Sequence, residues 1–291
     1  MPDIPVWNKC NNKCLMCANT ASFALNTAGD YLLARQAGRL ERFLAGAPAY
    51  RKNARTPGAW NLTGGEPTLN PDFIKALVYF RRRLPGAELL LLSNGRRFSD
   101  PAFAGAFAAA AKPPFTLGVS IHGPTAAEHD RVAGVKGAFR ETMLGFKNLL
   151  ALPRAPELEV RVILHKLNYA RLGATLGLLR RRVPGCRLVV MHYESEGRGA
   201  RNKKQLAVKL SATARAVNRS AARLEGFREV SLYHFPLCLL SPRLRPLARV
   251  SLPPEDRAYP AACRGCSGRG GCVGLMKPYL RAFGAAELKP L

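Results

Sequence analysis

Glu88-Leu-Leu-Leu-Leu-Ser93 decides the fold, because a continuous apolar run of this length is typical of a strand buried on both faces of a parallel sheet. A helical pattern over residues 71–83 precedes this run. Asp100-Pro101 follows it and predicts the start of another helix, with Asp as the N-cap and Pro at the first helical position. The stretch therefore belongs to a β/α unit.

Similar units extend toward both ends of the chain. Further strands are expected at residues 4–7, 60–63, 115–121, 157–165 and 187–193, and further helices at residues 30–45, 138–151, 170–182 and 212–224. Strands that alternate with helices predict a parallel sheet with helices outside it. We therefore expect an α/β fold over residues 1–228, with the parallel sheet curled into a full or partial barrel.

The composition of the chain changes after residue 231, where prolines and cysteines cluster and the periodicity of apolar residues weakens. Residues 229–291 are predicted to form a small Cys-rich appendage that is organised by bound ligands instead of by a large apolar core.

No targeting segment is evident. Residues 1–8 are too short and mixed for a signal peptide, and no apolar run approaches the roughly 18 residues of a membrane span. These features predict a cytoplasmic protein without membrane association. The cytosol keeps thiols reduced, so the eight cysteines are better interpreted as metal ligands than as disulfides.

The formal net charge of +26 bears on solubility and on the kind of partner the protein attracts, and it carries no information about the fold. Basic groups occur at residues 81–83, 180–182 and 198–204. They are either solvated helix faces or a surface for an acidic partner, which would be a peptide or a nucleic acid. No nucleic-acid-binding motif stands out.

Cys10, Cys14 and Cys17 form the strongest local pattern, with three thiols within eight residues. A four-iron cluster held by three thiolates leaves one iron open to a cofactor or substrate. The alternative is a zinc site completed by a distant Cys or His, since structural zinc takes four ligands.

Polar motifs stand where the predicted strands end. Gly64-Gly65-Glu66-Pro67 follows the second strand, Asn94 follows the third, and Ser120 ends the fourth. The glycine pair allows backbone to approach a ligand closely, and Glu66 offers an acceptor for an ammonium group. Ligand sites of parallel barrels gather at the carboxyl ends of the strands, so these residues are candidates for one site.

The CxxxCxxC spacing and the GGEP motif resemble those of the radical S-adenosylmethionine (SAM) superfamily over roughly residues 4–195. The resemblance implies a partial (β/α)6 parallel barrel of the radical SAM type and a [4Fe-4S] cluster on Cys10, Cys14 and Cys17, with SAM bound at the open iron. It implies reductive cleavage of SAM to a 5′-deoxyadenosyl radical that abstracts hydrogen from a substrate. An external electron donor such as flavodoxin or ferredoxin would supply the electron.

The resemblance also implies SAM contacts. The methionine part would lie against Gly64, Gly65 and Glu66, near Asn94, and the ribose would meet Ser120. Asn168 and His192 are weaker candidates for the ribose and adenine, and an ordinary loop or core role suits them as well. His122 is either a structural histidine or a substrate contact.

A second cysteine group comprises Cys238, Cys263, Cys266 and Cys272. Four thiolates suit one tetrahedral zinc ion or one four-iron cluster. The CxxCxxxxxC spacing is similar to the SPASM appendage of peptide-modifying radical SAM enzymes, but Met276 stands where that pattern has its next Cys. The resemblance therefore implies a shortened, Twitch-like region with one auxiliary [4Fe-4S] cluster. Cys186 is expected to be a small buried hydrophobe.

The appendage favours a ribosomal peptide as the substrate, by analogy with peptide maturases. Nine residues precede Cys10, so a separate peptide-recognition protein is a possible partner. The alternatives are a small-molecule radical dehydrogenase or cofactor-biosynthesis enzyme, an RNA-modifying enzyme, and a non-catalytic, zinc-stabilised binding protein.

Overall fold

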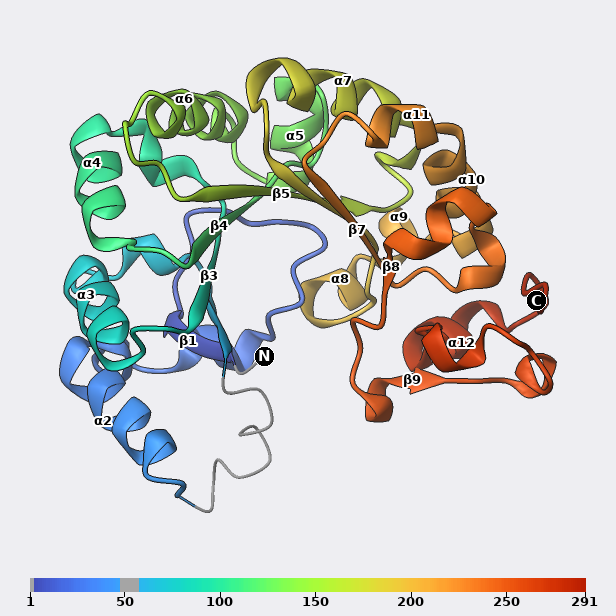
Figure 1. The fold of residues 1–291 in the computed structure, drawn as a ribbon, viewed down its shortest axis with the longest axis horizontal. Coiled ribbons are helices and arrows are strands. Elements are labelled where there is room, and N and C mark those ends of the chain that lie inside the picture. The colour runs from blue at the N-terminus through green and yellow to red at the C-terminus, as the bar shows by residue number, and fades with distance from the viewer. Residues whose placement is uncertain (1–2, 48–57) are drawn as a thin grey trace. The chain divides into compact units, whose positions relative to one another are not determined.

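A computed structural model describes residues 3–47 and 58–291 of the chain (Figure 1). The chain forms two compact units. The first comprises Met1–Lys13, Asn19–Ser120 and Val135–Glu159, and the second comprises Cys14–Ala18, Ile121–Gly134 and Val160–Leu291.

The first unit is a parallel sheet flanked by helices. Its strands are β1 (Asp3–Trp7), β2 (Ala59–Gly64), β3 (Glu88–Ser93) and β4 (Phe115–Ser120), and each pairs in parallel with the next. Its helices are α1 (Ala21–Leu25), α2 (Leu33–Leu44), α3 (Phe73–Arg83), α4 (Pro101–Ala110) and α6 (Ala138–Leu150). Helices α2, α3, α4 and α6 lie along the outer side of these strands (Figure 1).

Apolar side chains from β3 and α4 build much of this unit's core. Leu89 and Leu91 of β3 are fully buried. Phe107 of α4 lies 4.9 Å from Phe98 and 5.6 Å from Phe115, measured between ring centroids. Full burial of each such side chain contributes roughly 1.5–3 kcal/mol, so this layer is a large part of what stabilises the unit.

The second unit continues the alternation of strands and helices. Most of β5 (Glu157–Leu164) belongs to it, together with β6 (Arg187–His192), β7 (Glu229–Tyr233) and β8 (Ala248–Arg249). Strands β6, β7 and β8 pair in parallel in that order. The remaining elements are α5 (Ala126–Ala133), α7 (Leu172–Arg182), α8 (Gly197–Arg201), α9 (Lys203–Leu206), α10 (Leu210–Arg219), α11 (Ala221–Leu224), α12 (Lys277–Phe283) and the antiparallel pair β9 (Arg257–Ala258) and β10 (Leu275–Met276).

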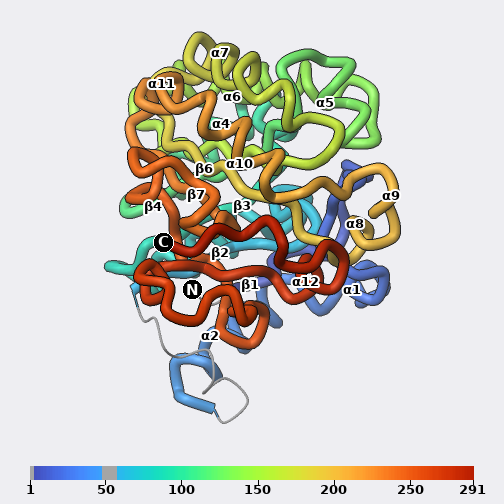
Figure 2. The backbone as a smooth tube through the Cα atoms, turned by 90° about the vertical axis from the view of Figure 1, so that its right-hand side faces the viewer, coloured from blue at the N-terminus to red at the C-terminus, as the bar shows by residue number. Residues whose placement is uncertain are grey.

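The path from β7 to α12 is mostly irregular. Short 3-10 turns interrupt it at Leu237–Leu239, Pro242–Leu247, Pro254–Asp256, Ala261–Cys263 and Arg269–Gly271. Figure 2 shows this part of the tube running through successive loops, and it also shows α8 and α9 next to each other. Within residues 3–47 and 58–291, none of the helices combines the length and apolar composition that crossing a bilayer requires.

The predicted α/β class with parallel strands is confirmed, and every predicted strand is present, Glu88–Ser93 with the same bounds. Two predicted helices are divided. Leu32 is extended between the turn Ala28–Tyr31 and α2, and Ser220 separates α10 from α11. Residues 229–291, predicted to be an appendage, begin with β7, a strand too short to show a clear pattern in the sequence.

Candidate functional site

The end of β2 lies against the segment that follows β1. The N–H of Gly65 donates to the carbonyl oxygen of Trp7 at 2.7 Å, and the N–H of Glu66 donates to that of Lys9 at 2.8 Å. A Cβ atom on Gly64 would lie 2.1 Å from the Trp7 oxygen, and one on Gly65 would lie 2.4 Å from the Lys9 oxygen. Both positions therefore require glycine, and what they approach is the backbone leading into Cys10.

Glu66 is buried and surrounded by donors. Its Oε1 accepts from the Thr68 N–H (3.1 Å), the Thr68 hydroxyl (2.7 Å) and the Ser93 hydroxyl (2.8 Å), while Oε2 accepts from the Asn94 N–H (2.7 Å). Burial raises the pKa of Glu66 above its ordinary value, and these hydrogen bonds oppose the shift. Three of the four bonds fall on Oε1, which leaves Oε2 as the oxygen with capacity for another donor.

The segment around Cys10 is held by side chains that follow β3. The Cys10 Sγ accepts from the Asn12 N–H at 3.3 Å and lies 3.9 Å from Asn94 Nδ2. The same Nδ2 donates to Asn11 Oδ1 at 2.7 Å. Asn94 thus contacts the cysteine segment itself.

Arg96 is a positioning residue that the sequence analysis missed. Its Nη1 donates to the Asn11 carbonyl at 2.6 Å and to Asn12 Oδ1 at 2.8 Å, and its Nε pairs with Glu141 at 2.7 Å. An arginine two residues after a strand-end asparagine is too common a feature to indicate this role from sequence.

Cys14 and Cys17 lie in a turn that belongs to the second unit. The Leu15 N–H donates to the Val132 carbonyl at 2.9 Å, and the Gly199 N–H donates to the Cys17 carbonyl at 3.1 Å. Residues 132 and 199 lie in α5 and α8, two helices to which the sequence analysis gave no role. They fix the backbone that carries these two thiols.

Histidines line the region next to Cys14. Nε2 of His122 lies 3.9 Å from Cys14 Sγ, and its ring stacks on His129 with 4.9 Å between centroids. Burial, and to a lesser extent His129 and His165, lower the pKa of His122 well below its ordinary value. His122 is therefore a neutral ring beside a predicted cluster ligand.

The other predicted strand-end residues differ in their surroundings. Ser120 ends β4 and is half-buried. Asn168 donates to the carbonyls of His122 (3.1 Å) and Ile163 (2.9 Å) and accepts from the His165 N–H (2.9 Å). His192 Nδ1 lies 2.9 Å from the Thr213 hydroxyl of α10. The structure thus gives Asn168 and His192 roles in holding strand ends and helix packing, and their contacts with SAM stay predictions.

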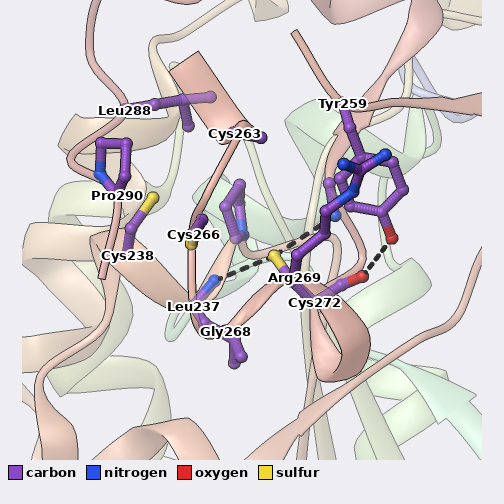
Figure 3. Close-up of a pocket in the computed structure, with 12 residues that line it drawn as sticks. Leu237, Cys238, Tyr259, Cys263, Cys266, Gly268, Arg269, Cys272, Leu288 and Pro290 are labelled. Carbon is purple, nitrogen blue, oxygen red and sulfur yellow. Dashed lines mark hydrogen bonds between the residues drawn. The ribbon is translucent and has the colours of Figure 1, made fainter. Parts of the chain in front are cut away.

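The four cysteines of the second group line one pocket (Figure 3). The Cys272 Sγ accepts from the backbone N–H groups of Leu237 and Gly274, each at 3.4 Å. The Cys266 Sγ accepts from the Leu291 N–H at 3.4 Å. Backbone N–H groups that donate to a sulfur atom favour its thiolate form, so these cysteines are suited to act as metal ligands.

The remaining wall of this pocket is partly apolar and partly basic. Burial raises the pKa of Cys263, the neighbouring thiols add to the shift, and Arg269 opposes it. The Tyr259 hydroxyl donates to the Cys272 carbonyl at 2.6 Å (Figure 3), and the Arg269 guanidinium lies over its ring. This fixes the loop that presents Cys272.

In the described part of the chain, no three Cys, His, Asp or Glu side chains are gathered closely enough to hold a single metal ion. Four thiolates are a full ligand set for one tetrahedral zinc ion or for one four-iron cluster, so the donor set fits an iron–sulfur cluster and fits zinc as well.

Comparisons with known proteins agree with the fold. No curated protein matches the chain. Among solved structures, SuiB of Streptococcus suis bound to its precursor peptide SuiA is 15% identical, with a TM-score of 0.55 over 78% of this chain and 47% of SuiB. anSMEcpe with AdoMet and the Kp18Cys peptide is 17% identical, with a TM-score of 0.58 over 80% of this chain and 62% of that one.

A third structure, TYW1 with a lysine–pyruvate adduct, is 16% identical with a TM-score of 0.50 over 74% of this chain and 70% of TYW1. The chain thus spans about half of SuiB and three fifths of anSMEcpe, and these likenesses show the fold alone. The family model described as "Radical SAM superfamily" matches residues 4–179, more than half of the chain. This span carries the three clustered cysteines and the glycine-rich end of β2, and the chain belongs to the radical SAM superfamily.

Proposed function

We propose that the chain is a radical SAM enzyme that cleaves SAM reductively and modifies a peptide. The observation that carries the proposal is the surrounding of Cys10. Asn12 and Asn94 contact its sulfur, and Arg96 donates to the backbone carbonyl of the next residue, Asn11. Such support is expected of a metal ligand, because neighbouring hydrogen bonds orient the sulfur.

Cys10, Cys14 and Cys17 are the proposed ligands of a [4Fe-4S] cluster, and SAM would bind at the iron that they leave free. When bound, the cluster and SAM supply a 5′-deoxyadenosyl radical for abstraction of hydrogen from the substrate. The side chains of the protein bind SAM and orient it. Glu66 presents Oε2 to the SAM ammonium group beside the glycine pair, and Ser120 offers a hydroxyl to the ribose.

The pocket of Cys238, Cys263, Cys266 and Cys272 is proposed to hold an auxiliary [4Fe-4S] cluster in a Twitch-like region, residues 229–291. Four thiolates would complete its ligand set, which favours electron transfer over binding of substrate. The backbone N–H groups on Cys272 support this role, since hydrogen bonds to sulfur help set a cluster's potential.

A peptide substrate is supported by SuiB and anSMEcpe, whose structures hold peptides. The net charge of +26 suits an acidic leader segment. We propose a flavodoxin or ferredoxin as the electron donor, a separate recognition protein for the peptide, and a cytoplasmic location where thiols stay reduced. Co-expression with candidate short peptides and mass spectrometry of the products tests the substrate. Peptides that leave with unchanged masses in every pairing count against it.

Anaerobically reconstituted protein should form 5′-deoxyadenosine from SAM and dithionite. The triple variant Cys10→Ala/Cys14→Ala/Cys17→Ala should lose this activity and about four irons while staying folded. Cys186→Ala is the matched control. The Cys186 thiol is buried, so its removal should leave both the 5′-deoxyadenosine formation and the iron content unchanged. Formation of 5′-deoxyadenosine by the triple variant would refute the proposed function.

A further inference from the structure

Residues 288–291 form no helix or strand, yet they belong to the wall of the cysteine pocket. Leu288 and Pro290 line this pocket on the side where Cys238 lies (Figure 3). The backbone N–H of Lys289, between them, makes a hydrogen bond to the Cys238 sulfur. One side of the pocket is thus built by both the side chains and the backbone of this short segment.

Leu291 contacts a second thiol. Its N–H donates to Cys266 Sγ at 3.4 Å, and its main-chain oxygen accepts from the Ser267 N–H at 3.1 Å. These two bonds tie residue 291 to the turn that presents Cys266. Residues 288–291 therefore supply N–H donors to two of the four thiols, and such donors favour a sulfur that carries the negative charge of a metal ligand.

Glu287 fixes the start of this segment. Its Oε2 accepts from the Ser211 N–H at 2.8 Å, and its Oε1 accepts from the Tyr279 hydroxyl, whose oxygen accepts from the Leu210 N–H at 2.8 Å. Leu210 and Ser211 open α10, and the side chain of its N-cap Lys209 makes no capping bond. The Glu287 carboxylate therefore replaces the missing cap, because it satisfies a donor that a helix start leaves free and places negative charge at that end of the helix.

Hydrogen bonds, and not apolar burial, hold the segment in place. Lys289, Pro290 and Leu291 are exposed, so little apolar surface is removed from water there. The four cysteines are themselves only half-buried. Release of the segment would therefore open the pocket to water on the Cys238 side and remove the N–H donors of two thiols at once.

We propose that residues 288–291 form a strap over the auxiliary metal site and that Glu287 is the positioning residue that ties this strap to α10. The inference rests on the proposed function, which places a metal centre on these cysteines. The strap shields the centre from water and stabilises the thiolates of Cys238 and Cys266 through its two N–H groups. It acts on the thiolates, so it serves a four-iron cluster and a zinc ion alike.

The first test separates the N–H of Leu291 from its side chain. It uses the whole chain with Cys10→Ala/Cys14→Ala/Cys17→Ala, in which bound metal belongs to the auxiliary site. In this background Leu291→Pro removes the N–H that bonds Cys266, and Leu291→Ala keeps it. A chelator should remove the metal roughly 5- to 10-fold faster from the Pro variant, the loss of one hydrogen bond, and within twofold of the background rate from the Ala variant.

The second test removes the tie to α10. Glu287→Ala should release the whole strap, so metal loss should be faster than for Leu291→Pro. Glu287→Gln should restore part of the effect, because its amide oxygen can accept from the Ser211 N–H while its NH2 faces the Tyr279 oxygen. Glu255→Ala removes the same charge at an exposed site in the same region and is the control.

The midpoint potential supplies a readout that lost packing alone would not move. Hydrogen bonds to sulfur stabilise the more negative, reduced state of an iron–sulfur cluster. In a redox titration followed by electron paramagnetic resonance, Leu291→Pro should therefore have a lower midpoint potential than Leu291→Ala.

Equal rates of metal loss for Leu291→Pro, Glu287→Ala and Glu255→Ala would overturn the strap and leave the auxiliary site in place. A background protein that binds neither iron nor zinc would overturn the auxiliary site of the proposed function, and the strap with it.

Discussion

The Asn94 N–H donates a 2.7 Å hydrogen bond to Glu66 Oε2, so the carboxylate that follows β2 is bound to the first residue after β3. The Ser93 hydroxyl bonds the other oxygen of the same group. Asn94 in turn contacts the Cys10 sulfur through its side chain. The GGEP glutamate therefore orders the cysteine segment indirectly, in addition to any contact with SAM.

Glu66→Gln should destabilise the protein by about 1–3 kcal/mol, because an amide NH2 would face a donor at one of the two buried oxygens. Urea unfolding measures the change. Glu255→Gln, at an exposed site, is the control and should stay within about 0.5 kcal/mol of the unsubstituted protein. Equal stability of the two variants would show that the hydrogen bonds around Glu66 contribute nothing.

Gly65→Ala should weaken folding by about 1–3 kcal/mol or more, because the new Cβ would lie 2.4 Å from the Lys9 carbonyl oxygen. Gly105→Ala in α4 provides the opposite case, since no atom lies within 4 Å of its added Cβ. It should stabilise by roughly 0.5–1 kcal/mol through helix propensity. Denaturant midpoints of the two variants should move in opposite directions, and a shared direction would contradict the close approach.

Stability should fall on mild acidification of the metal-free protein. Burial lowers the pKa of His165 to about 4 and that of His192 to about 3, both below the ordinary value of 6.5. The unfolded chain therefore binds protons below about pH 6.5 that the native state does not. The protein therefore has its full stability above that pH. The free energy of unfolding decreases toward pH 4, by up to about 1.4 kcal/mol per pH unit for each histidine.

Urea titrations at pH 7, 6 and 5 measure this slope. His192→Asn should have a shallower slope than the unsubstituted protein, whatever its stability at pH 7. Identical slopes would mean that His192 is protonated in the native state.

Cys272→Ala should remove the auxiliary metal while formation of 5′-deoxyadenosine persists. The substitution deletes a thiol that accepts two backbone N–H groups and leaves those donors without a partner. Iron and zinc analysis of anaerobic protein should show a loss of about four irons. Cys186→Ala should keep its iron, because burial raises the pKa of that thiol to about 12 and it is not a thiolate at neutral pH. An equimolar loss of zinc in place of iron would favour a structural zinc site.

The strands were predictable because most of them are continuous apolar runs, as in Glu88–Ser93. Strand β7 was not predicted, since five residues with polar and apolar members give too short a pattern. Helix α5 was also missed. It is only eight residues long, and its N-cap Thr125 and the αL Gly134 after it are cues that many loops share.

Residue types and spacing identified the cysteines and GGEP, because both motifs are local in sequence. The role of Arg96 depends on contacts with Asn11 and Asn12, which lie far from it in the sequence, and no local pattern encodes such contacts. The glycine pair was interpreted as room for a ligand. Its tight approach to the Trp7 and Lys9 carbonyls is a backbone packing requirement that only the folded chain reveals.

All five histidines of the chain are buried, so none is available at the surface to change its charge near neutrality. The 45 lysines and arginines keep their charge across that whole range. Attraction of an acidic macromolecule to this protein should therefore be almost the same at pH 6 and pH 8. Added salt, which screens charges within a Debye length of about 10 Å at 0.1 M, would be the variable that releases it.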